Sequence, residues 1–408
     1  MLQRNWPVEG VTRVPYWVYQ DEELYQEEQR KIFRGPTWSY LCLEAELPEP
    51  QSFITTFVGD MPVVVTRNAD GALHAWENRC AHRGALICIQ ARGKAERFSC
   101  IYHNWTYDHE GNLATVAFRR GIAGKGGMPA DAKPESQAPK KFRVACAYGL
   151  VFGTLSEKAP ALEDYIGPDI LPRIKRVMRA PVKVLGSYTQ LLPNNWKLYM
   201  DNVKDTYHAS LLHVFFTKFR INRLTQKGGV FVSKDGAHHC TYTEMVEDTG
   251  DAYEKEGVRS AGSQKSFTLE KPELLEQVDE LGDRVAIQIL SLFPGFVLHQ
   301  IRNSLAARQV VPKGVNRTEL HWTLFGFDDD DAAMQRRRLM QANLVGPAGY
   351  ISMEDGAATG FVQRGVAASP ERASVIEMGG ATIGSGDSRI TETAVRGLWQ
   401  AWRGHMGL

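Results

Sequence analysis

The chain has 408 residues, of which 43% are hydrophobic and 23% charged, a composition typical of a globular protein long enough for two domains. Its 48 basic and 47 acidic side chains leave a net charge of +1, which argues against partners such as nucleic acid or an anionic membrane. No apolar run approaches the roughly 20 residues that a spanning helix needs, and the N-terminus lacks an apolar signal-peptide core. We therefore expect a cytoplasmic protein.

The first two segments of the chain differ in pattern. Residues 1–36 are predicted to form an N-terminal helical segment that packs on a later domain, with an amphipathic helix over residues 17–34. Residues 37–155 change to short β-type runs separated by turns, which predicts a small antiparallel β domain. Within it, residues 119–141 are rich in Gly, Pro and Lys and are predicted to form a long surface loop.

The third segment, residues 156–408, mixes both kinds of element and predicts an α+β domain. Residues 194–216 have a helical pattern, whereas 285–311 and 317–327 read as strands of one antiparallel sheet. Residues 328–346 begin with four aspartates and continue with arginines, a polarity that suits the dipole of a helix.

Two cysteine–histidine pairs lie in the β domain. They are Cys80-x-His82 and, after 17 intervening residues, Cys100-x-x-His103. Such a set can hold tetrahedral zinc, but classical zinc fingers place like ligands together, whereas each loop here offers one ligand of each kind. A Rieske [2Fe–2S] cluster uses two cysteines on one iron and two histidines on the other. We therefore predict a Rieske cluster, and a zinc-stabilised binding protein without redox chemistry is the alternative.

A second cluster of metal-ligand residues lies a hundred residues later. Residues 201–213, DNVKDTYHASLLH, contain Asp201, Asp205, His208 and His213. An ideal helix could not aim both histidines at one atom, so we expect a bulge or break near residues 209–212. Two histidines and one carboxylate make the facial triad of a non-haem Fe(II) oxygenase. Asp355 is the best distant candidate for the carboxylate, with Glu354 and Asp201 as competitors.

These two motifs together resemble the large (α) subunit of Rieske aromatic-ring-hydroxylating dioxygenases. The resemblance covers nearly the whole chain and includes ENRCAHRGAL, LPNNWKLY, VKDTYHASLLH, LFPGFVL and GPAGYISMEDGA. It is greatest to members that oxidise terephthalate, and salicylate 5-hydroxylases and anthranilate dioxygenases look more distant.

The resemblance implies a fold, a ligand set and an assembly. A Rieske β domain would be followed by a catalytic, helix-grip-like domain with a long antiparallel sheet flanked by helices. Cys80, His82, Cys100 and His103 would hold the cluster, and His208, His213 and Asp355 the mononuclear iron, because the family's aspartate matches the second acid of MEDGA. Asp205 matches an aspartate that bridges the iron site to a cluster ligand of the neighbouring subunit. The usual assembly is α₃β₃, with a small β subunit.

The expected reaction is cis-dihydroxylation of an aromatic carboxylate, with terephthalate as the expected substrate. Electrons would come from NAD(P)H through a separate reductase. Arg308 and Arg389 match arginines that hold the two ends of a para-dicarboxylate, since arginine binds carboxylates in bidentate geometry. A ring hydroxylase that acts on salicylate or anthranilate is the alternative within the enzyme class.

Overall fold

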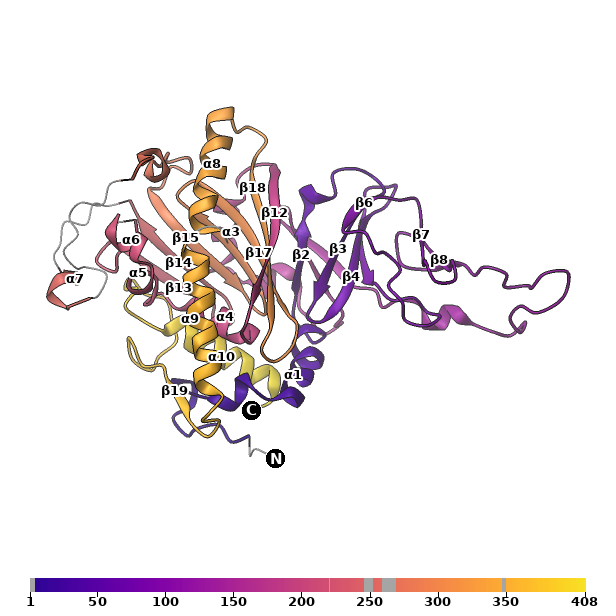
Figure 1. Ribbon diagram of the computed structural model, residues 1–408, viewed down its shortest axis with the longest axis horizontal. Helices are drawn as coiled ribbons and strands as arrows, with labels where there is room; N and C mark the ends of the chain where they lie inside the picture. Colours follow the sequence, from indigo (N-terminus) through magenta and orange to yellow (C-terminus); the bar gives the residue numbers. More distant parts are fainter. Residues whose placement is uncertain (1–3, 220, 246–251, 259–268, 347–349) are drawn as a thin grey trace. The chain divides into compact units, whose positions relative to one another are not determined.

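The structure is a computed structural model that describes residues 4–219, 221–245, 252–258, 269–346 and 350–408 (Figure 1). Its internal contacts divide the chain into two compact units. The smaller unit is Phe33–Leu162, and the larger one combines Met1–Ile32 with Glu163–Leu408. The N-terminal segment thus belongs to the same unit as the C-terminal part of the chain. Among the described residues, every helix is too short or too polar to cross a membrane.

The smaller unit, all of which is described, consists of short antiparallel strands in three sheets with the orders β10-β11-β2, β5-β4-β3-β6 and β7-β8-β9. Residues 119–141 form a long loop that contains the short 3₁₀ helix Pro134–Gln137. The strands are β2 (Ser39–Leu43), β3 (Ser52–Val58), β4 (Met61–Arg67), β5 (Leu73–Glu77), β6 (Arg92–Lys94), β7 (Phe98–Ser99), β8 (Thr106–Tyr107), β9 (Leu113–Thr115), β10 (Arg143–Ala147) and β11 (Leu150–Thr154).

An aromatic core fills the smaller unit at the two predicted ligand loops. Trp76, Phe98 and Tyr107 are buried there, and the rings of Phe98 and Trp76 meet edge to face at an interplanar angle of 72°. Cys80 and Cys100 belong to the same buried cluster. The two thiols therefore lie on the buried side of their loops, away from solvent.

The larger unit is built on one antiparallel sheet, with seven strands in its described part. Their order is β12-β18-β17-β16-β15-β14-β13. Sequence-adjacent strands from β13 to β18 pair with one another, as the runs over 285–311 and 317–327 predicted. The strands are β12 (Val182–Leu192), β13 (Gly228–Val232), β14 (His239–Glu244), β15 (Val285–Leu292), β16 (Phe296–Ile301), β17 (Ser304–Pro312) and β18 (Thr318–Phe327).

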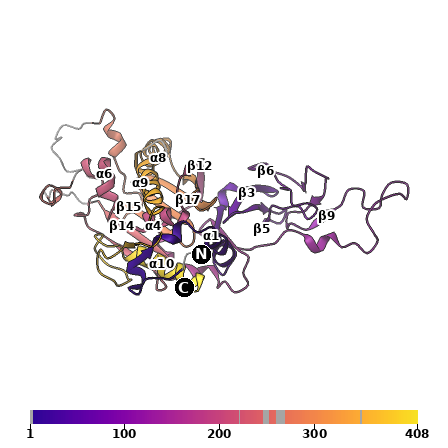
Figure 2. The same ribbon diagram turned by 60° about the horizontal axis from the view of Figure 1, so that its bottom comes forward.

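Three helices, α4 (Trp196–Lys204), α8 (Ala332–Val345) and α9 (Tyr350–Val366), are associated with this sheet. Helices α4 and α8 both contact β17, and α9 packs against α4 and α8 (Figures 1 and 2). Helix α8 begins where the predicted acid-to-arginine polarity places it, and the side chain of Asp331 caps it by accepting from the Met334 amide. The remaining helices are α2 (Leu162–Ile166), α3 (Leu171–Val177), α5 (Ala209–Leu212), α6 (Val214–Lys218), α7 (Ala252–Lys255) and α10 (Thr393–Met406).

The N-terminal segment forms three short elements rather than the single helix predicted over residues 17–34. A 3₁₀ turn (Tyr16–Tyr19) precedes α1 (Glu22–Glu28), and a π turn (Gln29–Phe33) follows it. The break has a local cause, because the Asp21 side chain accepts a hydrogen bond from the Leu24 amide and so starts a new helix. Strand β1 (Arg13–Pro15) pairs with β19 (Ala373–Val375).

The fully buried side chain of Glu28 ties α1 to two other helices. Its carboxylate accepts hydrogen bonds from the indole nitrogens of Trp196 on α4 and Trp402 on α10, at 2.8 and 2.9 Å. Lys197 Nζ lies 2.6 Å from the same carboxylate, so the buried charge is compensated. This anchor holds the start of α4, the helix that leads into the predicted iron site.

Candidate metal centres

The chain that carries the two predicted iron-binding histidines is helical only in pieces. Helix α4 ends at Lys204, and the Asp205 carboxylate then accepts a hydrogen bond from the Tyr207 amide at 2.8 Å. Helix α5 follows directly after His208, and a second break falls at His213, whose ψ of 86° is not helical. The breaks lie directly on either side of residues 209–212, so the irregularity expected near these residues is confirmed. Local capping by Asp205 explains the first break.

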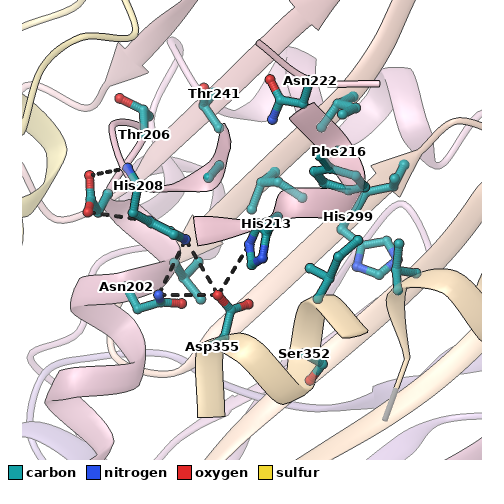
Figure 3. A pocket seen from close by; sticks show the side chains of 18 of the residues that line it. Asn202, Thr206, His208, His213, Phe216, Asn222, Thr241, His299, Ser352 and Asp355 are labelled. Atoms are coloured by element: carbon teal, nitrogen blue, oxygen red, sulfur yellow. Dashed lines mark hydrogen bonds and ion pairs between the residues drawn. The ribbon is translucent and has the colours of Figure 1, made fainter. Parts of the chain in front are cut away.

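The two breaks bring both histidines to the carboxylate of Asp355 on α9. The Nε2 atoms of His208 and His213 lie 3.5 and 3.3 Å from Asp355 Oδ1, and Figure 3 shows the three side chains converging. One possible ligand atom from each of the three lies within 4.8 Å of the others. Two imidazoles and a carboxylate in this arrangement suit a non-haem Fe(II) site with open positions.

Each of these histidines has a carboxylate on its other ring nitrogen. His208 Nδ1 lies 3.3 Å from Asp205, and His213 Nδ1 lies 2.8 Å from Glu354. Such partners fix the tautomer that leaves Nε2 free for a metal. Glu354, a competitor for the third ligand position on the sequence alone, instead faces the far side of His213. The other competitor, Asp201, accepts a hydrogen bond from the Trp399 indole.

The electrostatics of this site suit a cation. Burial opposes charge on His208, but hydrogen bonds to Asp205 and Asp355 outweigh it and raise the pKa of His208 to about 10. The pKa of His213 is also raised against burial, mainly by Asp355. The two histidines together hold the pKa of Asp355 well below its ordinary value, although burial acts in the opposite direction. The cluster therefore favours bound positive charge where the three side chains meet.

A cavity opens beside this site and contains both predicted substrate arginines. Arg308 on β17 and Arg389, which precedes α10, are 7% and 4% exposed. Arg308 donates from Nη1 to the Tyr199 hydroxyl at 2.8 Å. Arg389 donates to Asn222 Oδ1 and to two backbone carbonyls, and burial lowers its pKa to about 10. The remaining wall is largely apolar, with Phe216, Val345, Ile287, Ile289, Ile301 and Ile351.

The two cysteine–histidine loops have the same backbone design. In one, the Gly84 amide donates to the Cys80 carbonyl at 3.0 Å, and in the other the Asn104 amide donates to the Cys100 carbonyl at 2.9 Å. Gly84 and Asn104 occupy equivalent left-handed positions, with φ of 74° and 54°. Two matched turns thus hold two matched ligand pairs.

The side chains of these loops divide into a buried and an exposed pair. Both thiols are 2% exposed and lie next to each other, whereas the Nδ1 atoms of His82 and His103 face each other at 3.2 Å near the surface. Trp105 stacks on His82 with the ring centroids 4.7 Å apart. This donor set of two buried thiols and two exposed imidazoles suits a Rieske [2Fe–2S] cluster, which would be held by two cysteines and two histidines.

The sequence did not identify Tyr107 as a residue that contacts a predicted cluster ligand. The Tyr107 hydroxyl lies 3.3 Å from Cys80 Sγ and accepts from the Ala81 amide at 2.9 Å. Glu354 was named from the sequence only as a competing ligand, and its contact with His213 Nδ1 was not anticipated. The position of Tyr107, seven residues after Cys100, carries no recognisable spacing, because its contact depends on the pairing of β8 with β7.

Comparisons with known proteins agree with both centres. The family model for the Rieske [2Fe-2S] domain matches residues 37–123, and that for the ring hydroxylating alpha subunit (catalytic domain) matches residues 175–408. The Rieske match excludes the zinc-stabilised alternative. Naphthalene 1,2-dioxygenase with indole bound has the same fold, with a TM-score of 0.78 at 21% identity over 97% of this chain and 92% of that one.

Two relatives match at nearly full length. Terephthalate 1,2-dioxygenase, terminal oxygenase component subunit alpha 2, from Comamonas sp is 53% identical over 97% of this chain and 96% of its own length. The anthranilate 1,2-dioxygenase large subunit from Burkholderia cepacia is 46% identical over 99% of this chain and 95% of its own length. The α+β fold with a Rieske domain is thus confirmed. The chain belongs to the ring-hydroxylating dioxygenase family as a large oxygenase subunit, with a Rieske [2Fe–2S] cluster and a mononuclear non-haem iron.

Proposed function

We propose that this subunit catalyses the cis-dihydroxylation of an aromatic dicarboxylate, with terephthalate as its substrate. The observation that carries the proposal is the pair of buried arginines in the cavity beside the metal site. Neither Arg308 nor Arg389 pairs with a carboxylate among the described residues, and the Nε atom of each has no hydrogen-bond partner there. A buried, uncompensated guanidinium is costly, so two of them favour a ligand with two anionic groups. The name of the Comamonas relative supports the same substrate.

In this proposal, the residues expected from the sequence to bind metal do so at two centres. His208, His213 and Asp355 hold the mononuclear iron. Cys80, His82, Cys100 and His103 hold the cluster. When bound, the two iron centres supply the one-electron chemistry that activates O₂.

The protein's own contribution is positioning, orientation and exclusion of water. Asp205 and Glu354 hold the two imidazoles through Nδ1. The apolar wall of the cavity excludes water from the ring. Arg308 and Arg389 place the carboxylates, and therefore fix which edge of the ring faces the metal site. Asp205 is also the bridge from His208 to a cluster-ligand histidine of a neighbouring α subunit.

The partners follow from this role. Residues 37–155 form the Rieske domain and residues 156–408 the catalytic domain, to which the segment 1–36 is attached. The oxygenase is an α₃β₃ assembly with a small β subunit, and a separate reductase delivers electrons from NADH.

Product analysis with labelled oxygen tests the proposal. The oxygenase, reconstituted with a small subunit and a reductase, is supplied with ¹⁸O₂ and with terephthalate, isophthalate, phthalate, salicylate or anthranilate. We expect terephthalate to be consumed fastest and its diol to contain two labelled oxygens. Incorporation of one labelled oxygen into salicylate or anthranilate, with terephthalate left unchanged, would establish the hydroxylase alternative.

Variants of two arginines test, in the same experiment, whether the charge of Arg308 is needed for turnover. Arg308→Gln removes a buried charge from the cavity, and Arg317→Gln makes the same change at an exposed position at the start of β18. We expect the first variant to lose terephthalate turnover and the second to keep it. Equal turnover in the two variants would contradict the role of Arg308.

A further inference from the structure

A buried histidine of the cavity has no role in the metal site. His299 on β16 is fully buried and lines the cavity, and Figure 3 shows it beside the metal-binding side chains. Neither of its ring nitrogens has a hydrogen-bond partner among the described residues. Buried polar groups are nearly always paired, so two unpaired nitrogens in one cavity wall indicate a ligand that pairs them.

Two neighbours of His299 on the sheet, Arg308 and Trp322, each have one buried N–H group without a hydrogen-bond partner among the described residues. Strand register places Arg308 opposite Trp322, and His299 lies diagonally from Arg308 on the same face. The Arg308 guanidinium lies over the Trp322 ring, 4.7 Å from its centroid, and the His299 and Trp322 rings meet edge to face at 5.6 Å. Like His299, Arg308 Nε and Trp322 Nε1 have no hydrogen-bond partner among the described residues. Three N–H groups from three adjacent strands therefore border one part of the cavity.

The charge state of His299 makes it a donor to anions rather than a second cation. Burial, and then the nearby charge of Arg308, lower the pKa of His299 well below its ordinary value. A neutral imidazole has one N–H donor and one acceptor nitrogen. It can hydrogen-bond a carboxylate without adding to the positive charge that Arg308 already buries.

Arg308 alone does not satisfy a carboxylate. Its Nη1 is already bonded to the Tyr199 hydroxyl, whereas a carboxylate has two oxygens with about four acceptor positions. We propose that His299 and Trp322 complete the subsite for the substrate carboxylate at Arg308, each by donating one N–H to a carboxylate oxygen. This inference rests on the proposed function, and it assigns three adjacent strands of the sheet to the recognition of one end of the substrate.

Calorimetric titration of terephthalate into the anaerobic, iron-loaded, oxidised oxygenase tests this inference. His299→Leu removes both ring nitrogens, and His299→Gln and His299→Asn each keep an N–H donor at a different reach. His321→Leu is the matched control, because His321 precedes Trp322 on β18 and points to the opposite face of the sheet. Iron content and visible absorbance are measured for every variant.

We expect His299→Leu to raise the Kd for terephthalate roughly ten- to a hundredfold, as expected for a lost hydrogen bond to a charged group. Either His299→Gln or His299→Asn should recover most of this loss, and the control should stay within about threefold of the wild type. A Kd for His299→Leu within threefold of the wild type would overturn the inference. An equal rise of the Kd in all three His299 variants would also overturn it, whether or not these variants keep their iron.

The outcomes separate this inference from the proposed function. If the wild-type protein binds no aromatic carboxylate, the proposed function itself fails. If the wild type binds terephthalate and Arg308→Gln does not, but His299→Leu binds normally, the substrate assignment stands and only the role of His299 is wrong.

Discussion

The Nδ1 atom of His213 lies 2.8 Å from a carboxylate oxygen of Glu354, the residue next to Asp355. Two consecutive acidic residues of α9 thus act on opposite edges of one imidazole, since Asp355 lies 3.3 Å from the Nε2 atom. At His208, the Asp205 carboxylate lies within ion-pair distance of Nδ1, at 3.3 Å. Carboxylates in this position orient histidine ligands and raise their basicity.

Glu354→Gln should weaken Fe(II) retention by roughly ten- to a hundredfold, because the neutral amide removes the negative charge that raises the basicity of His213 and can present a donor as well as an acceptor to Nδ1. The iron content of purified protein after graded chelation measures this loss. Glu273→Gln, an exposed substitution in the same unit, serves as control and should keep its iron. Unchanged retention in Glu354→Gln would show that the contact does not support the metal.

Asp205→Asn should leave the cluster absorbance and the iron content near normal and lower turnover at least a hundredfold. The amide oxygen can still cap the Tyr207 amide, so the chain break at His208 is kept while the negative charge beside Nδ1 is lost. Oxygen uptake with reductase and NADH measures turnover. Normal turnover in this variant would exclude Asp205 as the bridge.

Arg389→Ala should raise the KM for terephthalate at least tenfold and the KM for benzoate less than threefold. Terephthalate loses the charge partner of its second carboxylate in this variant, whereas benzoate has only one carboxylate. Asn222→Ala removes the Nη1 partner but keeps the charge, and should have the smaller effect. Equal losses on both substrates in Arg389→Ala would indicate that the arginine supports the surrounding loop instead.

Tyr107→Phe should lower the reduction potential of the cluster. The hydroxyl lies 3.3 Å from Cys80 Sγ, and a hydrogen bond to a ligand sulfur stabilises the more negative, reduced cluster. Redox titration followed by the paramagnetic signal of the reduced cluster measures the shift. The exposed Tyr148→Phe is the control and should leave the potential unchanged.

His238 should make the protein less stable in acid. Its Nδ1 accepts from the Phe293 amide at 3.1 Å, and burial lowers its pKa to about 4. Between the ordinary value near 6.5 and this value, the unfolded chain binds the extra proton, so the free energy of unfolding falls as pH falls, by on the order of 3 kcal/mol. Urea unfolding is measured from pH 8 to pH 4, and the free energy of unfolding of His238→Asn should fall less over this range than that of the wild type. An equal fall in both proteins would contradict this role of His238.

Residues close together in the sequence were the easiest to assign. The Cys80–His82 and Cys100–His103 pairs, and the His208–His213 pair, predicted two metal sites because the members of each pair lie within one loop or one broken helix. The break expected near residues 209–212 is present on both sides of them, but the cap formed by Asp205 was not foreseen, because it depends on side-chain geometry that spacing does not reveal. The strands over 285–311 and 317–327 followed from alternation and turns.

The pattern of residues along the sequence did not predict the contacts between segments that are distant in the chain. Asp355 was chosen over Glu354 through the resemblance, because adjacent acids on a helix look alike in a single sequence. His299 lies on a strand whose residues are all buried, so alternation does not separate a cavity face from the core. The unpaired ring nitrogens became visible only when β16, β17 and β18 were placed side by side.

The carboxylate of Glu28 has a consequence for protein engineering. It joins the beginning of the chain to α4, and the two histidines proposed to bind iron follow shortly after the C-terminal end of that helix. Deletion of the first thirty residues would leave the Lys197 ammonium without its counter-ion in a dry interior. Affinity tags and truncations at this end of the polypeptide should therefore be judged by iron occupancy as well as by yield.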